Sequence, residues 1–147
     1  MVINLKLIKN KKIMEGIDKA MTNPGIFARV LKSILKTYKV TDREKEHFWC
    51  IGLNTRNNIK YIDLVSLGTL NSSLVHPREV FRLAIYKGVS VLIIGHNHPS
   101  GDPAPSNEDI KITQRLIEAG RIIGIEVLDH VIIGGTGYYS LKEHGIF

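Results

Sequence analysis

Apolar residues recur at helical spacing in three segments of the chain, and each segment carries start or stop signals typical of a helix. Asn23 can cap the first helix, Pro24 suits its first position, and the apolar stripe predicts that this helix continues to about Tyr38. A proline at the start and a glycine at the end bound the second helix within residues 77–88. Ser106 opens the third helix, which again has one apolar face.

Extended segments rich in branched and aromatic residues alternate with these helices. Strands are predicted over residues 2–8, 48–53, 59–67, 89–94, 126–133 and 138–141. Turn residues separate the second of these strands from the third, which predicts a β-hairpin. The strand at residues 89–94 has almost no polar interruption, as expected in a sheet covered on both faces, and a loop from His96 to Pro105 follows it. This order of elements predicts an α/β protein with a mixed β-sheet flanked by helices.

Length and cysteine content narrow the class of protein. The 147 residues suit one domain, and we expect a short N-terminal segment over residues 1–22 and a single domain over residues 23–147. No apolar run approaches the length of a membrane span, and the first residues lack the pattern of a secretory signal, so we expect a cytoplasmic protein. The single cysteine, Cys50, excludes a cysteine-rich zinc site, and we expect it to be a small core residue.

The net charge of +6 is concentrated near the N-terminus. Residues 1–46 contain 11 Lys or Arg against 5 Asp or Glu, whereas residues 47–147 contain 9 of each kind. A basic segment of this kind can attract the phosphate backbone of a nucleic acid through a field that does not depend on sequence. A solvated surface that keeps the protein soluble explains the same charges equally well.

Two histidines and one aspartate bound the most informative segment of the chain. His96 and His98 are separated by one residue just after a predicted strand, so both imidazoles can lie on the same side of an extended backbone. Asp109 follows in the first turn of a helix and offers a third metal ligand. Three protein ligands leave the fourth position of a zinc ion open to a water that can attack a carbonyl. Helix capping is an alternative to metal binding for Asp109, because Ser106 and Asp109 also fit a capping box.

The same segment matches the JAMM/MPN metalloprotease pattern, which is His-x-His-Pro, six residues, Ser, two residues and Asp. In more detail it resembles the bacterial RadC family, as do Pro77-Arg-Glu-Val, residues 113–116 and Leu128-Asp-His-Val. The resemblance covers residues 23–147 and implies the JAMM/MPN architecture, which is cytidine-deaminase-like. Asn97 stands where many JAMM proteins have Ser or Thr, and this difference removes no ligand.

The resemblance also implies the roles of individual residues. It implies a Zn²⁺ ion held by His96, His98 and Asp109, with Ser106 helping to stabilise the oxyanion and a separate glutamate acting on the water. In the family this glutamate begins the first core strand, and the stretch that starts at Glu46 resembles that strand.

Two other glutamates compete with Glu46 for this role. Glu44 has the same strand parity but lies nearer to the preceding helix, where a solvated charge is the simpler explanation. Glu79 lies in the first turn after Pro77, where a carboxylate favours the helix dipole without any catalytic role.

His130 follows an acid within an apolar strand, and we expect it to be structural.

Two functions follow from these observations. The first is a zinc-dependent hydrolase of the JAMM type that cleaves a peptide or isopeptide bond in a peptide or protein substrate. The alternative is a DNA-associated, RadC-like repair protein without protease activity, which uses the basic N-terminal segment for a weak association with nucleic acid. A zinc deaminase is excluded, because its pattern requires a pair of cysteines that the chain does not have.

Overall fold

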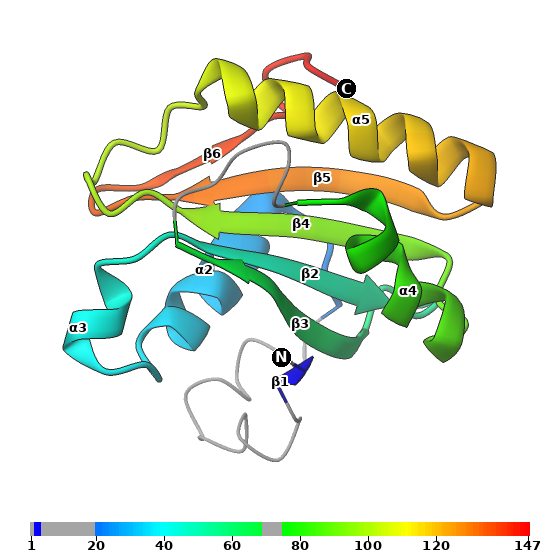
Figure 1. The fold of residues 1–147 in the computed structure, drawn as a ribbon, viewed down its shortest axis with the longest axis horizontal. Helices are drawn as coiled ribbons and strands as arrows, with labels where there is room; N and C mark the ends of the chain where they lie inside the picture. The colour runs from blue at the N-terminus through cyan, green and yellow to red at the C-terminus, as the bar shows by residue number, and fades with distance from the viewer. Residues whose placement is uncertain (1, 4–19, 69–74) are drawn as a thin grey trace.

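A computed structural model describes residues 2–3, 20–68 and 75–147 of the chain (Figure 1). The elements in chain order are β1 (Val2–Ile3), α2 (Pro24–Leu35), α3 (Val40–Arg43), β2 (His47–Leu53), β3 (Ile59–Leu67), α4 (Pro77–Lys87), β4 (Val91–Asn97), α5 (Asn107–Ile123), β5 (Glu126–Ile133) and β6 (Tyr138–Ser140). No helix among these described parts is long and apolar enough to cross a bilayer.

The strands form one mixed sheet in the order β1-β3-β2-β4-β5-β6. Strands β4 and β5 are parallel, and α5 provides the crossover between them, as a parallel pair requires. The other neighbouring strands pair in antiparallel orientation. Because β2 runs antiparallel to β4, the start of β2 lies beside the end of β4, at the left of the sheet in Figure 1.

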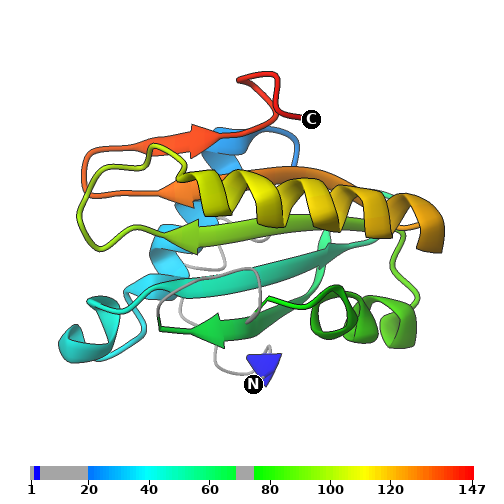
Figure 2. The ribbon, with the colours of Figure 1, turned by 45° about the horizontal axis from the view of Figure 1, so that its top comes forward.

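Helices cover both faces of the sheet. Helix α2 lies on one face, and α4 and α5 lie on the other, as the two views in Figures 1 and 2 show. Strand β2 is buried along its whole length and serves both layers through alternate side chains. Trp49 and Ile51 pack in the core beneath α2, whereas Phe48 and Cys50 pack in the core beneath α4 and α5. The predicted α/β class, with a mixed sheet flanked by helices, is confirmed.

Local signals in the sequence correctly identify the helix starts. The Asn23 side chain caps α2 by accepting a hydrogen bond of 3.0 Å from the Ile26 backbone N–H. Helix α2 ends at Leu35 rather than near Tyr38, and the short helix α3 follows, which has too few turns to produce a periodic pattern. Gly88 ends α4 in the left-handed conformation, with φ of 65°.

Several strand boundaries differ from the prediction, by one residue in β2 and β6 and by more in β4. Strand β4 continues to Asn97, so the prediction that the loop begins at His96 is wrong. Backbone pairing with both β2 and β5 keeps His96 extended, and this pairing is not visible in the local sequence. Of the strand predicted over residues 2–8, Val2 and Ile3 are in β1, and the other residues lie outside the described parts of the chain.

Candidate metal centre

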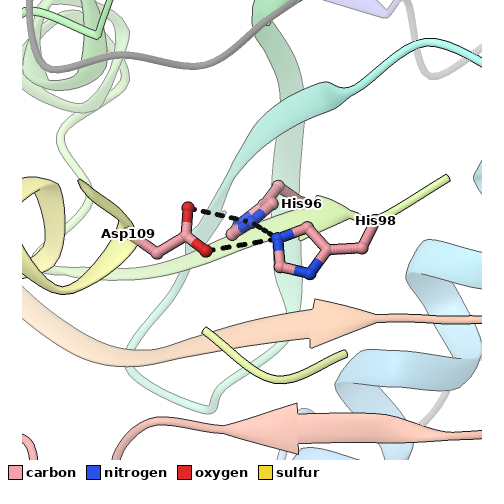
Figure 3. A group of neighbouring side chains, drawn as sticks. All are labelled: His96, His98 and Asp109. Carbon is pink, nitrogen blue, oxygen red and sulfur yellow. Dashed lines mark hydrogen bonds and ion pairs between the residues drawn. The ribbon is translucent and has the colours of Figure 1, made fainter. Parts of the chain in front are cut away.

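Three side chains from two elements converge where β4 ends and α5 begins (Figure 3). His96 is the penultimate residue of β4, His98 directly follows the strand, and Asp109 lies in the first turn of α5. The side chains of His96 and Asp109 are 0% and 4% exposed, whereas that of His98 is 14% exposed. The group is therefore buried on the protein side and accessible to solvent at His98.

The distances within this group suit a small divalent cation. His96 Nε2 lies 2.9 Å from His98 Nε2, 3.3 Å separate His96 Nε2 from Asp109 Oδ1, and 3.2 Å separate His98 Nε2 from Asp109 Oδ2. Tetrahedral zinc ligands with bonds of about 2.0–2.1 Å lie about 3.3 Å from one another. The two imidazole nitrogens and the carboxylate of Asp109 are thus close enough together for one metal ion to bridge them.

A chain of hydrogen bonds sets the tautomer of His96. The Thr113 hydroxyl donates its single hydrogen to the Asp109 carbonyl at 2.6 Å, so it accepts from His130 Nδ1–H. His130 Nε2 is then an acceptor, and it lies 2.7 Å from His96 Nδ1. Burial lowers the pKa of His130 well below its ordinary value, which keeps this imidazole neutral. His96 therefore carries its proton on Nδ1 and directs the lone pair of Nε2 towards His98 and Asp109.

His98 is oriented in the same way by its own loop. Its Nδ1 lies 2.9 Å from the Asp102 carbonyl oxygen, which can only accept, so Nδ1 carries a proton and the lone pair of the neutral imidazole is on Nε2. When both histidines are neutral, their Nε2 lone pairs consequently face each other beside a carboxylate. Such an arrangement repels itself unless a cation lies between the three groups, and a metal ion satisfies it.

The charge of Asp109 is strongly favoured in this environment. Burial opposes ionisation of the carboxyl, but the interactions of Asp109 with the imidazoles of His96 and His98 hold its pKa well below the ordinary value. The pKa of His98 is raised mainly by its hydrogen bond to Asp109, with smaller contributions that include the charges of Asp109 and Glu46. In the metal-free protein, a proton on His98 therefore lies between His98 and Asp109, where a metal ion would bind.

The capping box predicted at the start of α5 is present together with the ligand group. Ser106 Oγ accepts from the Asp109 backbone N–H at 3.1 Å, and Asp109 Oδ2 accepts from the Ser106 N–H at 2.8 Å. One carboxylate thus caps the helix and also faces both histidines. The two explanations of Asp109 that the sequence left open are compatible with each other. Accepting a hydrogen bond leaves the Ser106 hydroxyl hydrogen available to donate.

The three candidate glutamates lie in two places. Glu46 immediately precedes β2, half-buried, and lines a hollow with Glu44, Pro99 and Ser100 beside the His98 loop. Glu79 lies on α4, where it forms ion pairs of 3.3 and 3.6 Å with two arginines of the same helix. Glu46 and Glu44 therefore flank the ligand group, whereas Glu79 has partners of its own elsewhere.

Asn97 connects the ligand strand to the segment that carries Glu46. Its Oδ1 accepts from the His47 backbone N–H at 2.6 Å, and its Nδ2 donates to the Lys45 carbonyl at 3.0 Å. These two backbone groups flank Glu46, and Asn97 itself is 3% exposed. The residue between the two histidines therefore holds the backbone on both sides of Glu46.

Sequence reasoning missed the roles of Asn97, Thr113 and His130 at this site. His130 is fully buried, as expected of a structural residue, but it contacts His96 directly. The register of β4 and β5 pairs Ile94 with His130, so His130 and His96 lie on the same face of neighbouring strands. Strand parity could have identified this contact, but only if the register were already known.

Comparison with known proteins extends these observations. A family model described as a RadC-like JAB domain matches residues 21–146. The chain is 59% identical over 104 residues to a UPF0758 protein of Desulforudis audaxviator, an alignment that covers 71% of this chain and 45% of that protein. UPF0758 proteins of Listeria welshimeri (58% over 103 residues; 70% and 46% covered) and Bacillus cereus (58% over 102 residues; 69% and 45% covered) are similarly close. The chain spans about half the length of the curated relatives it matches.

Proposed function

The chain belongs to the family of RadC-like JAB domains, and from this premise we propose that it is a zinc-dependent hydrolase of the JAMM type that cleaves a peptide or isopeptide bond. The observation that supports this function best is the convergence of two imidazole lone pairs and one carboxylate at His96, His98 and Asp109. Three ligands of these types are typical of catalytic zinc, which keeps one position open for water or substrate.

The donor set fits zinc in number, type and spacing. When bound there, zinc lowers the pKa of a water and polarises a carbonyl group. His96 and His98 present deprotonated nitrogens, and Asp109 supplies the negative charge that lowers the cost of burying a divalent cation. The partial exposure of His98 leaves a path for a substrate chain to approach the open side.

Glu46 is the proposed general base. It accepts a proton from the attacking water and later donates this proton to the amine that leaves. Its half-buried position beside the exposed edge of the ligand group supports this role, and Asn97 holds the backbone on both sides of it. Glu44 lines the same hollow and serves as the matched control for Glu46.

Ser106 is proposed to stabilise the developing oxyanion. Its hydroxyl oxygen is held at the start of α5 by the Asp109 N–H, and its hydrogen is available to the carbonyl oxygen of the scissile bond. Ser106→Ala should reduce kcat by about 10²-fold, since loss of one oxyanion donor has effects of this order. Ser106→Thr retains the hydroxyl and should retain most of the activity.

Metal analysis and cleavage assays test the proposed function together. Protein purified without chelator should contain close to one zinc per chain, and His96→Ala or Asp109→Ala should lose it. A panel of peptides and lysine-linked isopeptides, analysed by mass spectrometry, should reveal a cleaved bond. Glu46→Gln should keep zinc and lose turnover, whereas Glu44→Gln should keep both.

Two results would contradict the proposal. The first is wild-type protein that does not retain zinc even when it is supplied. The second is zinc-loaded protein that cleaves no peptide or isopeptide but binds DNA with an affinity that falls steeply as salt rises. The second result would favour the alternative function, a DNA-associated protein without protease activity.

A further inference from the structure

A hollow of about 410 Å³ opens directly beside the candidate metal centre. His98 and Pro99 line it on the side of the centre, and Ile133 and two glycines line it at the end of β5. The end of α2 forms another wall through Leu35, Lys32 and the C-cap residue Lys36. Because His98 borders both the hollow and the ligand group, the hollow lies next to the candidate metal centre. Its volume is within the range of about 300–1,000 Å³ found for ligand sites.

The charged side chains that line this hollow are all positive. Lys32, Lys36 and Arg43 contribute to its wall, and no carboxylate does so among the described residues. Lys32 lies in the last turn of α2 and Lys36 is its C-cap residue, four residues further on, an arrangement in which like charges repel. Neither lysine forms an ion pair within the parts of the chain that the structure describes. An anion bound between them would relieve this repulsion.

The third cation is held in a fixed position. Arg43 Nε donates to the Tyr38 carbonyl at 2.8 Å, and Arg43 Nη2 donates to the Lys36 carbonyl at 2.6 Å. These bonds anchor the guanidinium just beyond the C-terminus of α2 and leave other N–H donors free for a further acceptor. A guanidinium also stays charged at all relevant pH values. The hollow is therefore lined by one preorganised cation and by two lysines.

A second hollow that Pro99 also lines has a different charge. This hollow, of about 420 Å³, is lined by Glu44 and Glu46, and its lysine, Lys45, is already paired with Asp42 at 3.2 Å. The hollow beside α2 therefore attracts an acidic side chain, whereas the second hollow repels it.

We propose that the hollow between α2 and His98 binds an acidic side chain of the peptide substrate, next to the bond that is cleaved. This inference rests on the proposed hydrolase function and specifies its substrate class. A peptide fits better than a nucleic acid because the three cations line one hollow that also has apolar walls at Leu35 and Ile133. A phosphate backbone is instead bound by cations spread along an extended surface.

The test compares peptides that differ only in charge. A peptide identified by the cleavage assay is prepared with Glu or with Gln at each position flanking the scissile bond. For zinc-loaded wild-type protein, Glu on one side of that bond should raise kcat/KM by about five- to tenfold over Gln, which is the order expected for two partly exposed charge pairs. The Lys32→Gln/Lys36→Gln double variant should lose this preference and cleave the Glu and Gln peptides with equal kcat/KM.

A matched double variant controls for net charge. Lys60→Gln/Lys87→Gln removes two exposed lysines from β3 and α4, outside the hollow, and should retain the preference for Glu. Equal cleavage of the Glu and Gln peptides by wild-type protein would overturn the inference while leaving the hydrolase function intact. A preference that survives loss of Lys32 and Lys36 would overturn it as well.

Binding assays test the acidic-peptide site even if the hydrolase function fails. If no peptide is cleaved, the anisotropy of fluorescein-labelled Glu and Gln peptides and of a labelled single-stranded oligonucleotide is measured with both double variants. Weaker binding of the Glu peptide specifically to the Lys32/Lys36 variant would support an acidic-peptide site. Loss of oligonucleotide binding alone would overturn it in favour of a nucleic-acid surface.

Discussion

Several residues around the candidate metal centre each make one contact that supports the fold and another that orders the site. Asp109 caps α5 and faces both histidines, Asn97 is part of β4 and holds the backbone around Glu46, and His130 packs in the core and accepts from His96. A substitution at any of these positions changes both the local structure and the chemistry of the site. Stability, metal binding and turnover therefore have to be measured separately for each variant.

Asn97 provides the first prediction at this scale. Asn97→Ala removes the hydrogen bonds to Lys45 and His47, so the Glu46 backbone loses its attachment to β4. We expect zinc content to stay near the wild-type value and kcat to fall about 10- to 100-fold, because a misplaced proton acceptor slows the reaction while the ligands remain. Asn97→Asp keeps one of the two bonds and should have an intermediate kcat. Unchanged kcat in both variants would contradict the positioning role.

His130 provides the second prediction. His130→Phe fills the buried space but cannot accept from His96 Nδ1–H, so we expect zinc affinity to fall about 10- to 100-fold. His130→Gln offers a carbonyl oxygen as acceptor and should recover part of the lost affinity. Competition with a zinc-binding dye measures this effect, and thermal unfolding of the metal-free variants provides the control. Equal affinities of the two variants would indicate that His130 acts through packing alone.

At the scale of elements, the metal centre depends on how closely the His98 loop packs against the β5–β6 turn. The Gly135 backbone N–H donates to the Gly101 carbonyl at 3.0 Å, and the His98 N–H donates to the Ile133 carbonyl at 2.9 Å. The last residue of β5 and a residue of the turn are thus bonded to the two ends of the loop segment from His98 to Gly101. The position of His98 consequently depends on contacts with the end of β5 and the turn after it, not on β4 alone.

Gly134→Ala tests this contact between the loop and the turn. A Cβ atom at residue 134 would lie 2.3 Å from the Gly101 carbonyl oxygen, and no rotamer change relieves a clash between backbone groups. We expect the free energy of unfolding to fall by about 1–3 kcal/mol and zinc affinity to fall with it. Gly137→Ala lies in the same turn, with open space around its new methyl group, and should change neither quantity. Urea unfolding and zinc titration measure both effects.

At the scale of the whole molecule, the ligand group links global stability to pH. The raised pKa of His98 contributes stability that is complete below the unfolded value of about 6.5 and is lost as pH rises through the folded pKa. The lowered pKa of Asp109 contributes stability that is present above about 3.9 and is lost as pH falls through the folded pKa. Both contributions coexist in the metal-free protein between about pH 4 and 6.5.

Unfolding measurements at two pH values test this linkage. In metal-free protein, His98→Gln should lower the free energy of unfolding more at about pH 5.5 than at about pH 8.5, because its charged pair with Asp109 exists at the lower pH. In zinc-loaded protein, His98→Gln should instead lower the free energy of unfolding more at about pH 8.5 than at about pH 5.5. Protons compete with zinc for His98, so stabilisation by the metal weakens on acidification. A cost of His98→Gln that is the same at both pH values would contradict this assignment.

Helices α2, α4 and α5, the hairpin and the three candidate ligand residues were predictable because their signals are local. Asn23, Pro24 and Gly88 act within one or two turns of their own helices, and the spacing from His96 to Asp109 lies within one connection of the chain. The end of β4 was predicted too early because pairing with distant strands keeps His96 extended. Hydrogen bonds of this kind depend on register, which the local sequence does not contain.

The amino-acid sequence by itself determined which side chains are available as ligands, which helices begin beside them, and that the layers are of the α/β kind. Those properties follow from periodicity, capping and spacing, which act over a few residues. The tertiary structure alone decided that His130 and Thr113 set the tautomer of His96. It also decided that Asn97 holds the segment of Glu46, and that the lysines at the end of α2 border the hollow at His98. These contacts join residues far apart in the chain, and only the register of the sheet and the packing of helices on it bring such residues together.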